Sequence, residues 1–187
     1  QYDVIISESS NPWMAGIAAL FTKEFYELSR QRLAPGGVMC QWLQLYRILP
    51  ADVKLIVKTF QEVFPYTSVW STIPGDLVLI GTVAPHQLDY DSLKQQLARP
   101  EIRQDLDRIA RAHPRAFVEF FWLGPEQVRT LAADVTWLHE DDQPWLEFSA
   151  PKALYLGDTL RVNYRGFERF KVPASTIAPN LVAAEED

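Results

Sequence analysis

The first part of the chain alternates between strand and helix patterns, and this restricts it to few folds. A β-branched run over residues 2–7 is followed by helical periodicity over 20–33, a second strand pattern over 38–43, and an amphipathic segment from Pro50 to about residue 64. Strands that alternate with helices in this way form a parallel sheet with helical crossovers. These residues therefore predict a doubly wound α/β fold.

Two further β-rich runs follow the second helix. They cover residues 67–72 and 76–83, and only Ile73, Pro74 and Gly75 separate them. A connection this short cannot hold a crossover helix, so the two runs predict an antiparallel hairpin. The expected sheet has parallel strands and an antiparallel hairpin at its edge.

The composition changes beyond Pro85 toward Gln, Arg, Leu and Asp. Helical periodicity there predicts a helical appendage with helices at 89–98, 100–112, 115–122 and 125–133. We therefore expect three parts: an α/β part over residues 1–84, a helical insertion over 85–140, and a C-terminal segment over 141–187.

The C-terminal segment opens with two acidic residues. Asp141 and Asp142 predict a turn that leads into an aromatic extended run ending at Phe148. A short helix is expected near 151–157, and the tail after about residue 174 is expected to fray.

Composition excludes several classes of protein. The chain has 187 residues, a net charge of −6 and a single cysteine, Cys40. The scattered Lys and Arg argue against duplex nucleic acid as a partner, whereas a cationic substrate fits the acidic balance. No window reaches the roughly 18 to 20 apolar residues of a membrane-spanning helix. One cysteine allows no internal disulfide, which favours a cytoplasmic setting.

The start of the chain carries no targeting signal. The first residue is Gln1 and not an initiator Met, and a strand pattern begins directly after it. We expect the chain to begin inside a larger gene product.

The loop after the first strand is the leading candidate for a functional site. Ligands of doubly wound sheets bind at the carboxyl ends of the parallel strands. Glu8, Ser9, Ser10 and Asn11 place a carboxylate, two hydroxyls and an amide at this position. The alternative is a capped loop in which Ser9 and Ser10 only satisfy backbone groups.

Three segments resemble the spermidine synthase family of polyamine aminopropyltransferases: residues 2–12, 20–26 and 33–41. The resemblance extends over about residues 2–83, and residues 141–148 are similar to the ending of bacterial spermidine synthase-like proteins. Some of those proteins are fused to membrane domains, so a membrane domain upstream is compatible with the resemblance. It implies the C-terminal portion of such a protein, without the first half of the Rossmann sheet.

The resemblance also implies a reaction. The family has a methyltransferase-type Rossmann fold, uses decarboxylated S-adenosylmethionine as aminopropyl donor, and has a small cationic amine such as putrescine as acceptor. It implies no metal and no permanently bound cofactor. Since the missing half would hold the methionine and ribose portions of the donor, we expect this chain alone not to turn over.

Residue roles follow from the resemblance. Glu8 takes the position of the family's catalytic carboxylate, which can hold an amine and accept its proton. Ser9, Ser10 and Asn11 shape the loop. Gln41 takes a position that lines the pocket for donor and amine, where its amide could bond a ligand or the loop of Glu8. The alternative for Gln41 is a strand-end residue facing solvent.

The chain departs from the family pattern at the proposed site. Glu8 and Asn11 stand where the family has two aspartates, and the hairpin turn at Pro74 and Gly75 lacks the family's amine-binding tyrosine. Aromatic side chains could instead surround a cation. Trp13, Trp42 and Tyr46 are the candidates, with core packing as the alternative.

Other polar residues have ordinary explanations. Asp76, Asp141 and Asp142 are candidates for a second ammonium site, but turns and caps explain such residues more simply. Cys40 is expected to be structural. The three histidines are expected in solvated loops: His86, His113 and His139.

Two other functions remain open on the same fold. An S-adenosylmethionine-dependent methyltransferase would explain the lost aspartate and the short hairpin turn. A non-catalytic binding or assembly module would use the aromatic surface and the helical part for contacts. Members of the family that the chain resembles commonly dimerise, so a homo-oligomer is expected in all three cases.

Overall fold

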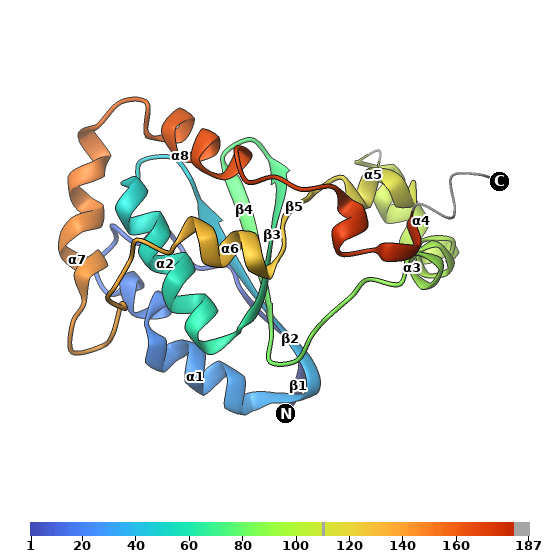
Figure 1. The fold of residues 1–187 in the computed structure, drawn as a ribbon, viewed down its shortest axis with the longest axis horizontal. Helices are drawn as coiled ribbons and strands as arrows, with labels where there is room; N and C mark the ends of the chain where they lie inside the picture. The colour runs from blue at the N-terminus through green and yellow to red at the C-terminus, as the bar shows by residue number, and fades with distance from the viewer. Residues whose placement is uncertain (110, 182–187) are drawn as a thin grey trace.

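The computed structural model describes residues 1–109 and 111–181. Its centre is a five-stranded sheet in the order β1-β2-β4-β3-β5 (Figure 1). β1 and β2 are parallel, and the other neighbouring strands are antiparallel. This confirms the α/β class with a partial Rossmann-like sheet. The strands are β1 (Tyr2–Ser7), β2 (Leu33–Gln44), β3 (Tyr66–Ile73), β4 (Asp76–Thr82) and β5 (Phe121–Leu123).

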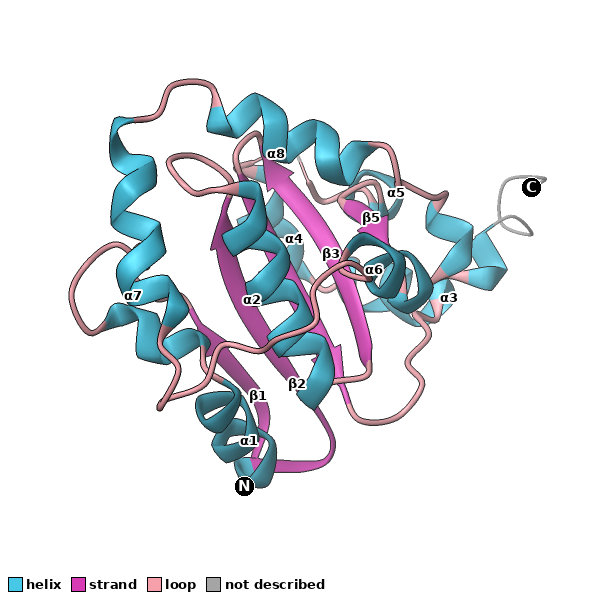
Figure 2. Cartoon of the chain, turned by 60° about the vertical axis from the view of Figure 1, so that its left-hand side comes forward, coloured by secondary structure: helices cyan, strands magenta, loops and turns pink. Residues whose placement is uncertain are grey.

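Two helices connect the first strands and cover one face of the sheet (Figure 2). They are α1 (Lys23–Arg32) and α2 (Pro50–Val63). The Thr22 hydroxyl accepts a hydrogen bond from the Phe25 N–H and so caps α1, which begins three residues later than predicted. A short 3₁₀ helix, η1 (Ile17–Phe21), precedes it. The main core between helices and sheet contains Phe21, Tyr26, Phe60, Phe64, Leu77 and Leu79.

The predicted hairpin is confirmed. β3 and β4 pair antiparallel, and only Pro74 and Gly75 lie between them. Gly75 has a φ of 101°, a conformation that glycine adopts without steric cost. Across the other edge of β4, Gln44 pairs with Asp76 and Gln41 pairs with Leu79. The start of β4 therefore lies beside the carboxyl end of β2.

The segment after β4 is helical but not throughout. It contains α3 (Tyr90–Leu97), α4 (Pro100–Asp107), α5 (Pro114–Val118) and α6 (Pro125–Leu131). The prediction of a helix over 115–122 is wrong, since α5 ends at Val118 and Phe121–Leu123 form β5. The helix predicted over 100–112 ends at Asp107, and residue 110 lies outside the described residues.

Tertiary packing explains the unexpected strand. Phe121 and Leu123 are buried, and they pair with Trp70 and Val69 of β3. The Ser71 N–H also donates to the Phe120 carbonyl. Burial against β3 thus outweighs the local helical pattern. The division into three parts stays a prediction, although this segment contributes a strand to the common sheet.

The predicted extended run over 145–148 is wrong as well. These residues begin helix α7 (Trp145–Ser149), in which Leu146 is buried and the Ser149 hydroxyl bonds back to the Trp145 carbonyl. A 3₁₀ helix, η2 (Ala150–Tyr155), takes the place of the short helix predicted over 151–157. Helix α8 (Thr159–Glu168) follows and had no counterpart among the predicted elements.

The chain does not fray at residue 174. A 3₁₀ helix, η3 (Ala174–Thr176), is followed by buried Ile177, Ala178 and Leu181, which pack in a second apolar cluster with Trp70. Residues 182–187 of the predicted frayed tail lie outside the described residues.

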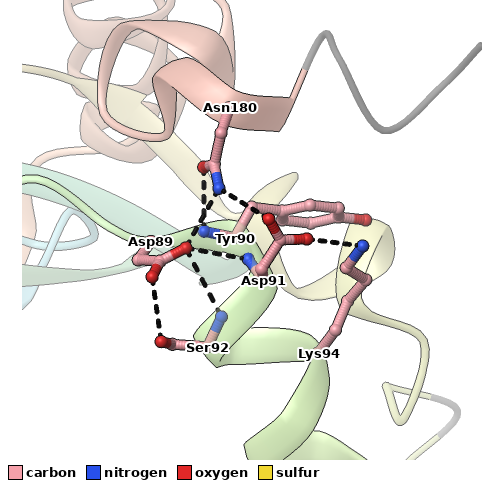
Figure 3. Close-up of polar contacts among 6 residues, drawn as sticks. All are labelled: Asp89, Tyr90, Asp91, Ser92, Lys94 and Asn180. Carbon is pink, nitrogen blue, oxygen red and sulfur yellow. Dashed lines mark hydrogen bonds and ion pairs between the residues drawn. The ribbon is translucent and has the colours of Figure 1, made fainter.

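Asn180 fastens this C-terminal segment to the start of α3 (Figure 3). Its side-chain oxygen accepts from the Tyr90 N–H at 2.9 Å, and its amide donates to Asp89 at 3.0 Å. Asp89 in turn caps α3 through the N–H groups of Asp91 and Ser92.

Within residues 1–109 and 111–181, no helix has the length and apolar character needed to cross a membrane.

Candidate functional site

The loop after β1 leaves the sheet at the carboxyl ends of the two parallel strands. Ser7, the last residue of β1, lies beside Gln41 of β2. The next residue, Glu8, is exposed to solvent. Its carboxylate has no hydrogen-bond or ion-pair partner among the residues that the structure describes. The predicted base is therefore accessible to a ligand.

Gln41 joins β2 to this loop. Its side chain is fully buried, and its amide nitrogen lies 2.9 Å from the Trp42 carbonyl, 3.3 Å from the Ser7 carbonyl and 3.5 Å from the Ser9 hydroxyl. The solvent-facing alternative for Gln41 is thereby wrong. The side-chain oxygen of Gln41 is also buried and has no partner within the described parts of the chain. The interaction with Ser9 fixes the start of the loop.

Asn11 forms the turn of the loop. Its carbonyl accepts a hydrogen bond from the Met14 N–H at 3.1 Å. The Asn11 side-chain nitrogen is buried and unpartnered among the described residues. Ser10 is exposed. The loop therefore carries polar groups that form no hydrogen bond with the described residues and remain able to bind a ligand.

Residues 139–147 contact the far end of the loop and the start of α1. The Gly16 N–H donates to the Glu147 carboxylate at 3.3 Å, and the His139 ring lies 2.9 Å from the Ala18 carbonyl. Lys23 pairs with Glu140 at 3.2 Å. The acidic turn at Asp141 and Asp142 is present and exposed, with a β-bridge between the flanking residues.

His139 corrects a sequence expectation. It is fully buried rather than solvated. Its ring packs against η1, and its backbone N–H donates a hydrogen bond to the Thr59 hydroxyl at 3.0 Å. Burial lowers the pKa of the imidazole. Neither His139 nor Glu147 could be found by local pattern, since their partners lie at least 80 residues away in the sequence.

The aromatic residues divide into two groups. Trp13 and Tyr46 pack edge to face with ring centroids 6.3 Å apart. Trp42 instead lies on β2, where it pairs with Val78 of β4. Whether any of them contacts a cation stays a prediction. Cys40 lies on the same strand, and burial raises the pKa of its thiol, as suits a structural cysteine.

Buried Gln44 at the end of β2 lies beside half-buried Asp76 at the start of β4. Gln44 is fully buried, and neither atom of its amide has a partner among the described residues. Its cross-strand neighbour Asp76 also has a buried, unpartnered oxygen. Burial raises the pKa of Asp76, and the Trp42 side chain opposes this. Asp76 was among the predicted candidates for an ammonium site, whereas Gln44 was not among the predicted site residues.

Fold and site together define an α/β protein with part of a Rossmann-like sheet and a carboxylate-bearing loop at its strand ends. Comparison with known proteins specifies this further. Residues 1–83 match the family described as spermine/spermidine synthase domain. A spermidine synthase of Dictyostelium discoideum is 32% identical over 85 residues, which cover 43% of this chain and 30% of that relative.

These comparisons confirm the resemblance predicted from the sequence for residues 1–83. The chain spans less than a third of the length of the curated relative that it matches.

Proposed function

We propose that the full-length protein containing this chain is an aminopropyltransferase. It transfers the aminopropyl group of decarboxylated S-adenosylmethionine to a small amine such as putrescine. The observation that carries this proposal is the match of residues 1–83 to a spermine/spermidine synthase domain. An accessible carboxylate, Glu8, at the carboxyl end of β1 supports it.

In the proposed reaction Glu8 acts as the general base and Gln41 positions its loop. A protonated amine must lose a proton before it can attack, and Glu8 accepts that proton. The amine nitrogen then forms a bond to the carbon next to the sulfonium sulfur. The bond between that carbon and sulfur breaks, and its electron pair leaves with methylthioadenosine. Gln41 positions the loop through its contact with Ser9.

The complete protein is needed for this activity in our proposal. The methionine and ribose portions of the donor would be bound outside residues 1–187. Val4 and Ile6 of β1, which is an edge strand here, are 53% and 73% exposed. Both side chains lie on one face of β1, and their apolar exposure supports the packing of a further segment against that face. We expect the 187-residue chain alone to show no turnover.

Ligand binding tests the proposal. Calorimetric titration of the full-length protein with methylthioadenosine and then putrescine should show binding of both, with the 187-residue chain as a comparison. Turnover of the decarboxylated donor should follow. Absence of binding by the full-length protein would contradict the proposal and favour an interaction module.

A methyltransferase is the second candidate. Asn11, which replaces a charged residue of the family pattern, and the two-residue turn at Pro74 and Gly75 favour it, because both reduce the means of binding an amine. Binding of the nucleoside without binding of putrescine, and use of S-adenosylmethionine as donor, would support this candidate instead.

A further inference from the structure

A groove lies between three helices, apart from the loop of Glu8. Helices α6 and α8 both pack against α2 on the helical side of the sheet (Figure 2). The groove between them has a volume of about 480 Å³. Sites for small molecules have volumes of about 300–1,000 Å³. Every residue that lines this three-helix groove belongs to one of the three helices or directly follows α8, and the loop after β1 contributes none.

The floor of the three-helix groove is apolar. Each helix supplies one core residue to it: Val53 from α2, Leu131 from α6 and Phe167 from α8. Pro50 and Val162 also line the groove and are exposed, Val162 by 52%. A hollow with an accessible apolar lining is typical of a ligand site. The groove can therefore hold the apolar part of a ligand.

Three cationic side chains line the same groove: Lys54, Arg165 and Arg169. Lys54 pairs with Asp134 at 2.7 Å. Arg165 and Arg169 have no ion-pair partner among the described residues, although the Arg169 guanidinium lies 4.9 Å from the centre of the Phe170 ring. Three cations against one carboxylate make the groove locally positive in a chain whose net charge is −6. This charge favours an anionic ligand.

The two free guanidinium groups can act together. Arg165 and Arg169 are four residues apart, and residues at this spacing are neighbours on one face of a helix. A guanidinium group binds the oxygens of a carboxylate or phosphate through paired hydrogen bonds. The groove thus places an oxyanion-binding pair beside an apolar floor.

Hydrogen bonds fix the walls of the groove. The buried Asn163 side chain of α8 donates to the Leu45 and Ile48 carbonyls at 2.8 and 2.9 Å. The Arg47 N–H donates to the Thr159 hydroxyl at 2.7 Å. These bonds hold α8 against the segment that leads into α2. A site formed in advance binds its ligand without the cost of ordering the protein.

Gly166 keeps one wall of the groove low. Apart from its own helix backbone and its two chain neighbours, no described atom lies within 4 Å of a β-carbon built at this position. Packing therefore does not require a glycine here, and glycine is unfavourable inside a helix. A larger side chain at this position would narrow the groove, so the need for open space explains the residue.

We propose that the three-helix groove binds a small amphiphilic anion, which is a carboxylate or phosphate joined to an apolar body. The oxyanion lies between Arg165 and Arg169, and the apolar body lies over the floor. A cation would be repelled by the two arginines, and a small inorganic anion would leave the apolar floor uncovered. This site is additional to the transfer reaction proposed for the loop of Glu8 and does not depend on it.

The test compares ligands that share one part of the proposed chemistry. The full-length protein is titrated calorimetrically with octanoate, octyl phosphate, octan-1-ol and acetate. At least one of the two amphiphilic anions should bind at a single site about tenfold more tightly than octanol or acetate, as charge-assisted hydrogen bonds would give. The tighter of the two identifies the head group. Binding of neither anion, or equal binding of octanol, would overturn the inference.

Variants locate the binding in the groove. The double change Arg165→Gln and Arg169→Gln should reduce the affinity for the tighter anion to that for octanol. Arg30→Gln removes one positive charge from an exposed position on α1 and should leave the affinity unchanged. Equal losses in both proteins would mean that only the net charge matters, which contradicts the proposed site.

Gly166→Leu tests the apolar part without a change of charge. Leucine favours helix, so the variant should fold, and its side chain should occupy the groove. We expect at least a tenfold loss of affinity for the tighter anion. If the double arginine variant and Gly166→Leu both bind it as the unmodified protein does, the ligand binds elsewhere and the inference is wrong. That result would leave the proposed aminopropyl transfer unaffected.

Discussion

Glu8 is an exposed carboxylate at the position where a ligand of this fold would lie. Its role can be tested by replacing the carboxylate with an amide of the same size. Glu8→Gln keeps the shape and removes the charge. Under the proposed mechanism, turnover by the full-length protein should fall about 100-fold to 10,000-fold, the range for loss of a general base. Steady-state kinetics with the decarboxylated donor measure this.

The stability of the Glu8→Gln variant should remain unchanged, because Glu8 has no partner to lose among the described residues. Glu168→Gln, on the exposed side of α8, is the matched control and should keep full turnover. Turnover that persists in Glu8→Gln would remove Glu8 from the mechanism.

At the residue level, the sequence pattern predicts the loop after β1 but not the residues that hold the loop in place. Glu8 follows the first strand pattern and Gln41 lies near the end of the second, so their place at the carboxyl ends of the strands could be predicted. Gln44 could not be predicted as a site residue, because only the pairing of β2 with β4 brings it beside Asp76. His139 was not found for the same reason, since its partners come from η1 and α2.

At the level of elements, the contact between β4 and α2 offers a sharp stability test. A side chain at Gly81 would lie 2.6 Å from the Phe60 ring and 2.7 Å from Phe64. Gly81→Ala should therefore destabilise the protein by about 1–3 kcal/mol, as overpacking does. Urea unfolding of the variant and the unmodified chain measures the difference.

Gly166 on α8 has open space around it, in contrast to the close contacts at Gly81. Apart from its own helix backbone and its two chain neighbours, no atom of the described residues lies within 4 Å of a β-carbon built there. Gly166→Ala should stabilise the protein by about 0.5–1 kcal/mol, because glycine is unfavourable inside a helix. Equal effects of the two alanine variants would show that the contact at Gly81 is not as tight as described.

The Asp89 carboxylate that caps the start of α3 makes the free energy of unfolding depend on pH. Hydrogen bonds from the Ser92 side chain, then from Asn180, lower the pKa of Asp89 below its ordinary value of 3.8. The folded state thus favours the ionised form, which contributes stability above about pH 3.8. That contribution is lost as the pH falls through the lower, folded-state pKa.

Asp89→Asn tests this dependence. Urea unfolding should show the variant to be less stable than the unmodified chain near neutral pH, with the gap closing in acid. Asp142→Asn should leave the unfolding curve unchanged at neutral pH. A constant gap at every pH would mean that the charge of Asp89 is not involved.

Sequence patterns predicted elements well where local and tertiary preferences agree. β1 and α2 are examples, since their apolar residues have the spacing of the structure they adopt. β5 shows the limit, because its three residues become a strand only through pairing with β3. The run after Pro144 became α7 because Leu146 packs into the core.

At the scale of the molecule, His139 links the C-terminal segment to η1 and α2. Burial lowers its pKa below the ordinary value of 6.5. The unfolded chain therefore binds a proton more readily, so the free energy of unfolding should decrease as the pH falls below about 6.5 and level off below the folded-state pKa.

Unfolding in urea between about pH 5 and about pH 7.5 tests this expectation. His139→Gln should lose the pH dependence assigned to this residue. His86→Gln, at an exposed position, should retain it. A slope that is the same in all three proteins would exclude His139 as its source.

The bond between the Gly16 N–H and Glu147 joins residues separated by 131 positions. On a ribosome that adds about 5–20 residues per second, the partner is made roughly 7 to 26 s after the loop. The candidate site therefore cannot mature during early synthesis, although β1, α1 and β2 are already present. Long-range contacts of this kind also slow folding. The nascent protein consequently spends seconds with the far end of its loop unanchored, an interval in which truncation or a stalled ribosome would leave β1 and β2 with an incompletely held loop.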